Sequence, residues 1–356
     1  MSGRTIPLVA SDTIWVARCP VPTLTGLALR TGRLADAFAG RHLWVRGIRE
    51  ANDVRFREQG FYHDVKTLFR EGGNYPALAA RALGHDTSVV VGLTWIDETQ
   101  LLLARPNSGL AGAGAAVLKQ AIFGLSRAPV GRDIWRAMAL RAYDTALKQA
   151  RLERSDVTLR DLTPYFGPAG ALPGGTWSAV SEGALLAGEV DIIYAKGAPA
   201  VALQKKHGLD VVLDLNTLPD RVLRINNGTP RPITVHRHLL DDAPELVVEF
   251  LKTLIETGRW ARENATEVAA VVAAETGTTE ADVLAGYGAD LATQFEVGLS
   301  DEWIASLQDQ SDFLSEAGLI SARVDVGKWI EPGLLTAARW HSASAPSAAP
   351  RETVRT

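Results

Sequence analysis

Short apolar runs alternate with segments of helical periodicity along most of this chain of 356 residues. Four of the runs have the composition and the bounding turn residues of buried strands: Thr13–Ala17, Ser88–Trp95, Val190–Tyr194 and Asp210–Leu215. Amphipathic stretches lie between them, the longest at Arg132–Leu152. This alternation predicts an α/β protein with mainly parallel sheets.

The length exceeds what one hydrophobic core usually fills, so we expect two lobes. We assign residues 1–113 and 225–341 to a discontinuous first lobe and residues 114–224 to the second, with NNGTP (Asn226–Pro230) returning the chain to the first. Residues 342–356 are small and proline-bearing, and we expect a disordered tail there. Ligands often bind at domain junctions, so a ligand cleft is expected between the lobes.

The composition excludes several classes of protein. A formal net charge of −4 argues against a nucleic-acid surface, and no apolar run is long enough for a membrane helix. Cys19 is the only cysteine, so no internal disulfide forms. A lipoprotein signal also ends at a cysteine, but Asp12 interrupts the apolar stretch and Arg18 precedes the thiol. We expect a cytoplasmic protein; its oligomeric state stays open.

Cys19 is the first candidate for chemistry, because it stands between an expected strand and an expected helix. The positive end of a helix dipole favours the reactive thiolate, and parallel strands direct their carboxyl ends toward the ligand. The alternative is a small buried apolar residue, which is the role of most lone cysteines.

The second candidate is the stretch FREGGNYPAL (Phe69–Leu78). Gly72 and Gly73 allow close approach of the backbone, Asn74 is a plausible N-cap, and Arg70 supplies a guanidinium. Amides at a helix start and an arginine together bind carboxylate, sulfinate or sulfonate. A structural turn with a surface arginine is the alternative.

Other signals are weaker. His236 and His238 in VHRH have no third ligand nearby in the sequence, so we expect no metal site. The chain has no G-x-S-x-G or H-E-x-x-H stretch, which removes the basis for a serine hydrolase or a zinc protease.

Taken together, several motifs resemble one family over nearly the whole chain. They are RCPVPT (Arg18–Thr23), FREGGNYPAL, GLTW (Gly92–Trp95), WAREN (Trp260–Asn264), GYGAD (Gly286–Asp290) and FLSEAGLI (Phe313–Ile320). The chain resembles the 2'-hydroxybiphenyl-2-sulfinate desulfinase-like family of aryl sulfinate desulfinases, which is similar to the substrate-binding proteins of ABC importers. The resemblance implies a two-lobed, periplasmic-binding-protein type II fold.

The same resemblance implies roles for single residues. The catalytic cysteine of the family falls on Cys19, its arginine on Arg70, and the amide that helps to hold the sulfinate on Gly73. The family's histidine, ten residues before the arginine, falls on Gly60, so it is absent here. His63 is the candidate replacement, and a gapped alignment sets Arg55 at the lost position instead.

A further departure follows the strand expected at Val190–Tyr194, where the family is apolar and this chain has Lys196. We therefore add Lys196 to Gly72, Gly73 and Asn74 as an expected substrate-binding residue, which suggests a more polar or doubly anionic ligand.

The resemblance implies a reaction in which Cys19, Arg70 and His63 cleave a carbon–sulfur bond in an organic sulfinate and release sulfite, with no cofactor or metal. Two alternatives stay open. One is a different Cys-dependent lyase or hydrolase acting on a small organic anion, and the other is a receptor that binds the anion without turnover, since this scaffold hosts both kinds of protein.

Overall fold

The structure is a computed structural model and describes residues 12–127, 133–162 and 177–344. Its first sheet has five strands in the order β2-β1-β3-β10-β4. They are β1 (Thr13–Arg18), β2 (Trp44–Gly47), β3 (Leu68–Glu71), β4 (Ser88–Thr94) and β10 (Arg231–His236). β1 is parallel to β2 and β3, whereas β10 is antiparallel to β3 and β4.

The second lobe repeats this strand order. β5 (Gln100–Ala104) lies antiparallel between β8 (Ile193–Lys196) and β9 (Asp210–Asp214). β6 (Ile122–Ser126) is parallel to β7 (Thr158–Leu162), and a bridge between Phe123 and Ile192 joins this pair to the edge beside β8. The resulting order is β7-β6-β8-β5-β9. In each lobe the one antiparallel strand is therefore contributed by the segment that crosses from the other lobe.

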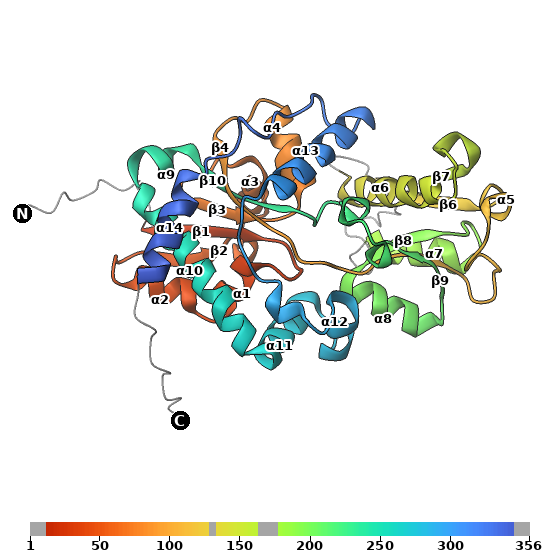
Figure 1. The fold of residues 1–356 in the computed structure, drawn as a ribbon, viewed down its shortest axis with the longest axis horizontal. Helices are drawn as coiled ribbons and strands as arrows, with labels where there is room; N and C mark the ends of the chain where they lie inside the picture. The colour runs from red at the N-terminus through yellow and green to blue at the C-terminus, as the bar shows by residue number, and fades with distance from the viewer. Residues whose placement is uncertain (1–11, 128–132, 163–176, 345–356) are drawn as a thin grey trace, which may run out of the picture.

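Figure 1 shows the two lobes at opposite ends of the long axis, with helices around each sheet. The first lobe carries α1 (Leu24–Arg30), α2 (Arg33–Ala39), α3 (Val54–Tyr62), α4 (Asn74–Ala82), α9 (Arg237–Asp242), α10 (Pro244–Glu263), α11 (Ala265–Thr276), α13 (Asp301–Glu316) and α14 (Gly333–Ser344). The second carries α5 (Ala115–Leu118), α6 (Ile134–Gln149), α7 (Trp177–Leu186) and α8 (Gly197–His207), and α12 (Glu280–Tyr287) packs on α8. Short 3-10 turns are η1 (Ile48–Glu50), η2 (Arg154–Asp156), η3 (Leu215–Thr217), η4 (Arg221–Arg224) and η5 (Leu291–Thr293).

The predicted α/β class is confirmed, with two differences in detail. Both sheets are mixed, because each crossing strand runs against its neighbours. The chain also leaves the first sheet between Thr94 and Gln100, since β5 already belongs to the second lobe, whereas we expected the boundary at residue 113. Apolar runs such as β4 and β5 look alike in sequence, so their composition does not tell which sheet each joins.

The chain end differs from expectation over three residues. α14 continues to Ser344, so residues 342–344 are helical, and the remaining residues of the expected tail lie outside the described ones. Within the described residues, no helix combines the length and the apolar character needed to cross a membrane.

Candidate active site

The thiol of Cys19 lies at the carboxyl end of β1, beside the loop that follows β3. Arg18 at the end of β1 is in register with Glu71 at the end of β3, so the two parallel strands present their following loops side by side. The amide of Gly73 donates a hydrogen bond to Sγ of Cys19 at 3.3 Å. The side chain of Cys19 is partly buried.

Arg70 reaches the same place from β3. Its side chain is buried, and Nη2 donates to the carbonyl oxygen of Gly73 at 3.0 Å. A Cβ atom placed on Gly72 would lie 2.9 Å from Nη2 of Arg70 and 3.3 Å from Sγ of Cys19. The guanidinium and the sulfur therefore both lie against the backbone of Gly72, where only a residue without a side chain fits.

Asn74 follows this loop but faces the protein interior. From the sequence we expected Asn74 to be the N-cap of α4, but the N-cap is Gly73. Nδ2 of Asn74 donates to the carbonyl oxygens of Asn226 at 2.7 Å and Pro230 at 3.0 Å, and the residue is fully buried. Its contacts hold the turn at residues 226–230 against α4.

The same turn accepts hydrogen bonds from the first two backbone amides of α4. The backbone amide of Asn74 donates to the carbonyl oxygen of Asn227 at 2.8 Å, and that of Tyr75 donates to Oδ1 of Asn227 at 2.9 Å. Of these three consecutive amides, only that of Gly73 is directed at the thiol.

The start of α1 is likewise occupied. The backbone amides of Leu24 and Thr25 donate to the carboxylate of Glu71 at 3.2 and 2.6 Å, and that of Gly26 donates to Oγ1 of Thr23 at 3.0 Å. The carboxylate of Glu71 and the hydroxyl of Thr23 therefore take up these three amides, so their hydrogen bonds do not reach the thiol as we had expected.

His63 lies just after α3 and is fully buried. Its Nε2 is 2.6 Å from Oγ1 of Thr234, the residue that pairs with Arg70 across β10 and β3. Burial, and then the positive charges of Arg70 and His236, lower the pKa of His63 to about 3. His63 is therefore neutral near pH 7, and the partner recorded for its ring is a threonine on the sheet rather than Cys19.

Position 60, where the family has its histidine, faces an apolar cluster. A Cβ atom on Gly60 would lie 3.4 Å from Cβ of Ala17 and 3.4 Å from Cγ2 of Ile48. The side chain of Arg55 lies outside the described ones.

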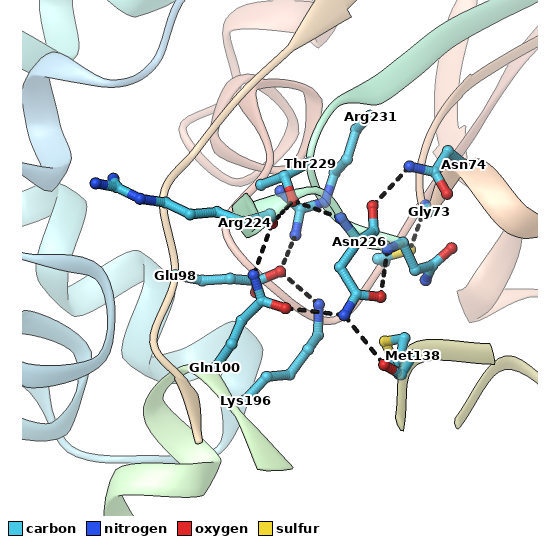
Figure 2. A network of polar contacts seen from close by, with 12 residues as sticks. Gly73, Asn74, Glu98, Gln100, Met138, Lys196, Arg224, Asn226, Thr229 and Arg231 are labelled. Carbon is cyan, nitrogen blue, oxygen red and sulfur yellow. Dashed lines mark hydrogen bonds and ion pairs between the residues drawn. The ribbon is translucent and has the colours of Figure 1, made fainter. Parts of the chain in front are cut away.

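Lys196 belongs to a separate cluster of charges where the two lobes meet (Figure 2). Its Nζ donates to Oε1 of Glu98 at 2.6 Å, and Nη2 of Arg231 lies 3.6 Å from the same oxygen. Glu98 and Arg231 are almost fully buried. A carboxylate thus neutralises Lys196, which weakens the expectation of a doubly anionic ligand.

Asn226 connects that cluster to the loop of Gly73. Its Nδ2 donates to Oε1 of Gln100 at 2.9 Å and to the carbonyl oxygen of Met138 at 3.1 Å, both in the second lobe. Its own carbonyl oxygen accepts from Asn74 in the first lobe (Figure 2). The turn therefore joins both lobes directly beside the thiol.

A surface cavity of about 600 Å³ lies elsewhere, on the second lobe, against Arg105–Ser108, Gln120 and Leu186. Its arginine is committed to internal contacts, with Nη1 donating to the carbonyl oxygens of Leu185 and Val190 and Nη2 to Asp191. None of the predicted site residues lines it, so we do not place the chemistry there.

No protein-family model matches the chain, and no curated protein is similar to it in sequence. Solved structures match over almost the whole length. A cysteine-to-serine mutant of DszB in complex with biphenyl-2-sulfinic acid has a TM-score of 0.73 at 22% identity, with 92% of this chain and 99% of that chain covered. The periplasmic aliphatic sulphonate binding protein SsuA from Escherichia coli has a TM-score of 0.66 at 16% identity, covering 98% and 96%.

The periplasmic nitrate-binding protein NrtA from Synechocystis PCC 6803 has a TM-score of 0.58 at 13% identity, covering 95% of this chain and 92% of that chain. The chain has the periplasmic-binding-protein type II fold. The strand order repeated in both lobes and the crossing strands agree with it. At these identities the likeness shows the fold and leaves the reaction to the chemistry of the site.

Within this type II fold, several residues of the site were not expected from the sequence. They are Arg18, Glu71, Glu98, Asn227 and Arg231. We interpreted Asn226, Asn227 and Gly228 only as a turn. Two side-chain amides in a turn that crosses between the lobes could have indicated hydrogen bonds to both of them. Among the described residues no group of three or more His, Cys, Asp or Glu side chains is arranged to hold a metal ion.

Proposed function

We propose that this protein is a cofactor-independent enzyme that uses Cys19 to cleave a carbon–sulfur bond in an organic sulfinate, with release of sulfite. One observation carries the proposal: the sulfur of Cys19 and the guanidinium of Arg70 both lie against Gly72, with the Gly73 amide directed at the sulfur. We take the region in front of Gly72, between these two groups, as the ligand space. The similarity to DszB, whose mutant was solved with biphenyl-2-sulfinic acid, supports the choice of ligand.

The anion is held first. The guanidinium of Arg70 and the backbone at Gly72 and Gly73 present hydrogen-bond donors to the two sulfinate oxygens, and charge-assisted bonds of this kind are among the strongest in proteins. The sulfur atom of the ligand then lies beside Sγ of Cys19, the reacting atom of the protein.

The overall reaction is R–SO2⁻ + H2O → R–H + HSO3⁻, so carbon gains a proton and sulfur gains hydroxide. In one route the thiolate of Cys19 attacks the sulfinate sulfur, the carbon leaves with the bonding pair and takes up a proton, and water cleaves the sulfur–sulfur bond to release bisulfite and the thiolate. In the other, the thiol protonates the carbon, the carbon–sulfur bond breaks, and the SO2 released is hydrated to bisulfite while the thiol regains a proton.

His63 has no direct part in either route as we propose it. It is neutral near pH 7 and bonded to Thr234, so it supports β10, the strand that pairs with the one carrying Arg70. A general acid or base contributes on the order of 10²–10⁴-fold, so an enzyme without one at position 60 is expected to be slow unless the thiol supplies the proton itself.

The test compares sulfite release from a small aryl sulfinate by the parent, Cys19→Ser and Arg70→Met. Cys19→Ser should lose turnover but retain binding, measured calorimetrically. Arg70→Met should weaken binding by about 10- to 100-fold, because a charge-assisted bond contributes roughly 1.5–3 kcal/mol. Turnover by the Cys19→Ser variant at the parent rate would exclude the thiol from the chemistry.

A receptor without turnover is the second candidate, supported by the same Arg70 guanidinium and Gly73 amide and by the likeness to SsuA and NrtA. It predicts tight sulfonate binding, no sulfite release, and equal affinity for the parent and Cys19→Ser. Binding accompanied by release of another leaving group, lost in Cys19→Ser, would instead indicate a different Cys-dependent reaction.

A further inference from the structure

The loop that carries Cys19 is tied down at both of its ends by charged side chains that point away from the ligand space. Arg18 precedes the thiol directly, and its side chain is only 1% exposed. Its Nη2 lies 2.8 Å from Oε1 of Glu50 and 2.9 Å from Oε1 of Glu275. Arg30 and Arg49 contact the same Glu275 carboxylate, which is itself 5% exposed.

Two glycines make room for the side chain of Arg18. A Cβ atom on Gly26 would lie 3.3 Å from Cδ of Arg18, and one on Gly47 would lie 3.0 Å from its Nη1. Arg18 therefore passes between the first turn of α1 and the end of β2 and reaches Glu275 on α11. Its ion pairs therefore fix the start of the Cys19 loop to two other elements of the first lobe, η1 through Glu50 and α11 through Glu275.

Glu71 fixes the other end. Its carboxylate is fully buried and accepts hydrogen bonds from the backbone amides of Leu24 and Thr25 and, at 2.7 Å, from Oγ1 of Thr94. Successive side chains of a strand point to opposite faces, so Glu71 holds α1 on one face of β3 while Arg70 reaches the ligand space on the other.

Between these anchors the loop has little freedom of its own. Pro20 and Pro22 restrict φ, and Thr23 caps α1. The position of Sγ relative to Gly73 is then set by where the two ends are held.

We propose that Arg18 and Glu71 are positioning residues that fix the Cys19 sulfur against the Gly73 amide and the Arg70 guanidinium. The inference rests on the proposed function for its catalytic consequence, but not for its effect on the thiol. A displacement of about 1 Å can cost on the order of 10²-fold in rate, so small movements of the loop matter.

The first variant is Glu71→Gln, which keeps the shape of the side chain. Its amide oxygen can accept from one of the two helix amides, but its NH2 group then faces another donor, so the start of α1 shifts. We expect kcat for sulfite release to fall by about 10- to 100-fold with KM within about 2-fold, because the donors for the anion stay in place.

A second readout follows the thiol itself. Iodoacetamide alkylation of Cys19 is measured with and without benzenesulfinate, and the protection factor is compared with the calorimetric affinity. In the parent the bound anion should protect the sulfur. In Glu71→Gln the affinity should be retained while protection falls at least several-fold, which general loss of stability does not produce.

Arg18 supplies a second, independent pair of variants. Arg18→Met should behave as Glu71→Gln, and Arg18→Lys, which keeps one charge but reaches one carboxylate, should recover part of kcat and of the protection. If Glu71→Gln does not fold, the two Arg18 variants test the proposed positioning of the thiol by themselves. Asp144→Asn is the matched control, because it removes the ion pair with Arg154 in the second lobe and should change neither readout.

Failure of this inference is distinct from failure of the proposed function. If the parent releases no sulfite but the anion protects Cys19, the protection factors of the variants still test the positioning. The positioning inference would be overturned if folded Arg18→Met and Glu71→Gln had the protection factor and kcat of the parent. It would also be overturned if Asp144→Asn lost protection and kcat as much as these variants do.

Discussion

Gly73→Ala tests the packing that holds the thiol loop and the turn at residues 226–230 together. A Cβ atom at position 73 would meet Oδ1 of Asn227 at 2.5 Å and its Cγ at 2.7 Å, and Nδ2 more closely still. Gly73 has φ −49° and ψ 142°, which alanine adopts without strain, so the whole cost is steric.

The size of the effect follows from what the amide of Asn227 would have to give up. Ordinary contact between carbon atoms is about 3.5–4.0 Å, so the amide must move by about 1 Å. Asn227 is buried and its Oδ1 accepts from Tyr75, so it cannot move without losing that bond. Overpacking typically costs 1–3 kcal/mol, and we expect Gly73→Ala to lower the free energy of unfolding by about 2 kcal/mol.

Asn227→Ala removes all three atoms that the new methyl group would meet. By itself it should cost about 1 kcal/mol, the usual contribution of one hydrogen bond. The double variant should be no less stable than Asn227→Ala alone, which gives a coupling of about 2 kcal/mol between the two positions.

Urea unfolding followed by tryptophan fluorescence measures all four proteins of this cycle. Gly40→Ala is the control, because Gly40 has φ −65° and no atom within 4 Å of its Cβ position, so that variant should be as stable as the parent or slightly more so. Additive losses for Gly73→Ala and Asn227→Ala, without coupling, would refute the steric reasoning.

Three further predictions concern buried charge. Burial alone would raise the pKa of Glu275, but hydrogen bonding and the charge of Arg18 outweigh it and hold the pKa below its ordinary value. The contribution of Glu275 to the free energy of unfolding should therefore be fully present above about pH 4.5 and be lost as the pH falls through the folded-state pKa, so urea titrations should show a smaller loss of stability in acid for Glu275→Gln than for the parent. Burial holds the pKa of His63 at about 3, so its ring signals in NMR spectra of the folded protein should not titrate above pH 5, and a midpoint near 6.5 would contradict this. The free energy of unfolding should fall as the pH drops from about 6.5 toward 3, because in that range only the unfolded chain takes up the proton. Lys196→Met should cost about 3 kcal/mol of stability by leaving Glu98 buried without its closest cation, and Glu98→Gln in the same chain should restore most of it; a raised KM with unchanged stability would instead make Lys196 a ligand contact.

The sequence was informative where the physics is local. β1 and α6 were expected within three residues of their observed ends, because strand and helix periods are recorded in neighbouring residues. The resemblance assigned Cys19 and Arg70 to one site, and their proximity in the structure follows from the parallel pairing of β1 and β3.

What sequence reasoning missed depends on contacts between distant segments. Tyr75 and Asn227 are 152 positions apart, and nothing in either stretch indicates the other. The role of Glu71 could not be seen because a glutamate beside an arginine looks like a surface pair, whereas the strand directs the two side chains to opposite faces. His63 was chosen as the replacement for the family histidine missing at Gly60, and its partner Thr234 lies 171 positions away on β10.

An anion receptor and a sulfinate-cleaving enzyme make the same demand on Arg70 and Gly73, since each must hold an oxyanion by charge-assisted hydrogen bonds. They differ in what they require at position 19. A receptor tolerates any small side chain that leaves the ligand space open, whereas an enzyme needs its reacting atom held to within about 0.5 Å. Buried charges such as Arg18 and Glu71 contribute little net stability, because desolvation offsets most of their attraction. Their main physical effect is to restrict geometry, and the geometry that they restrict is that of the thiol.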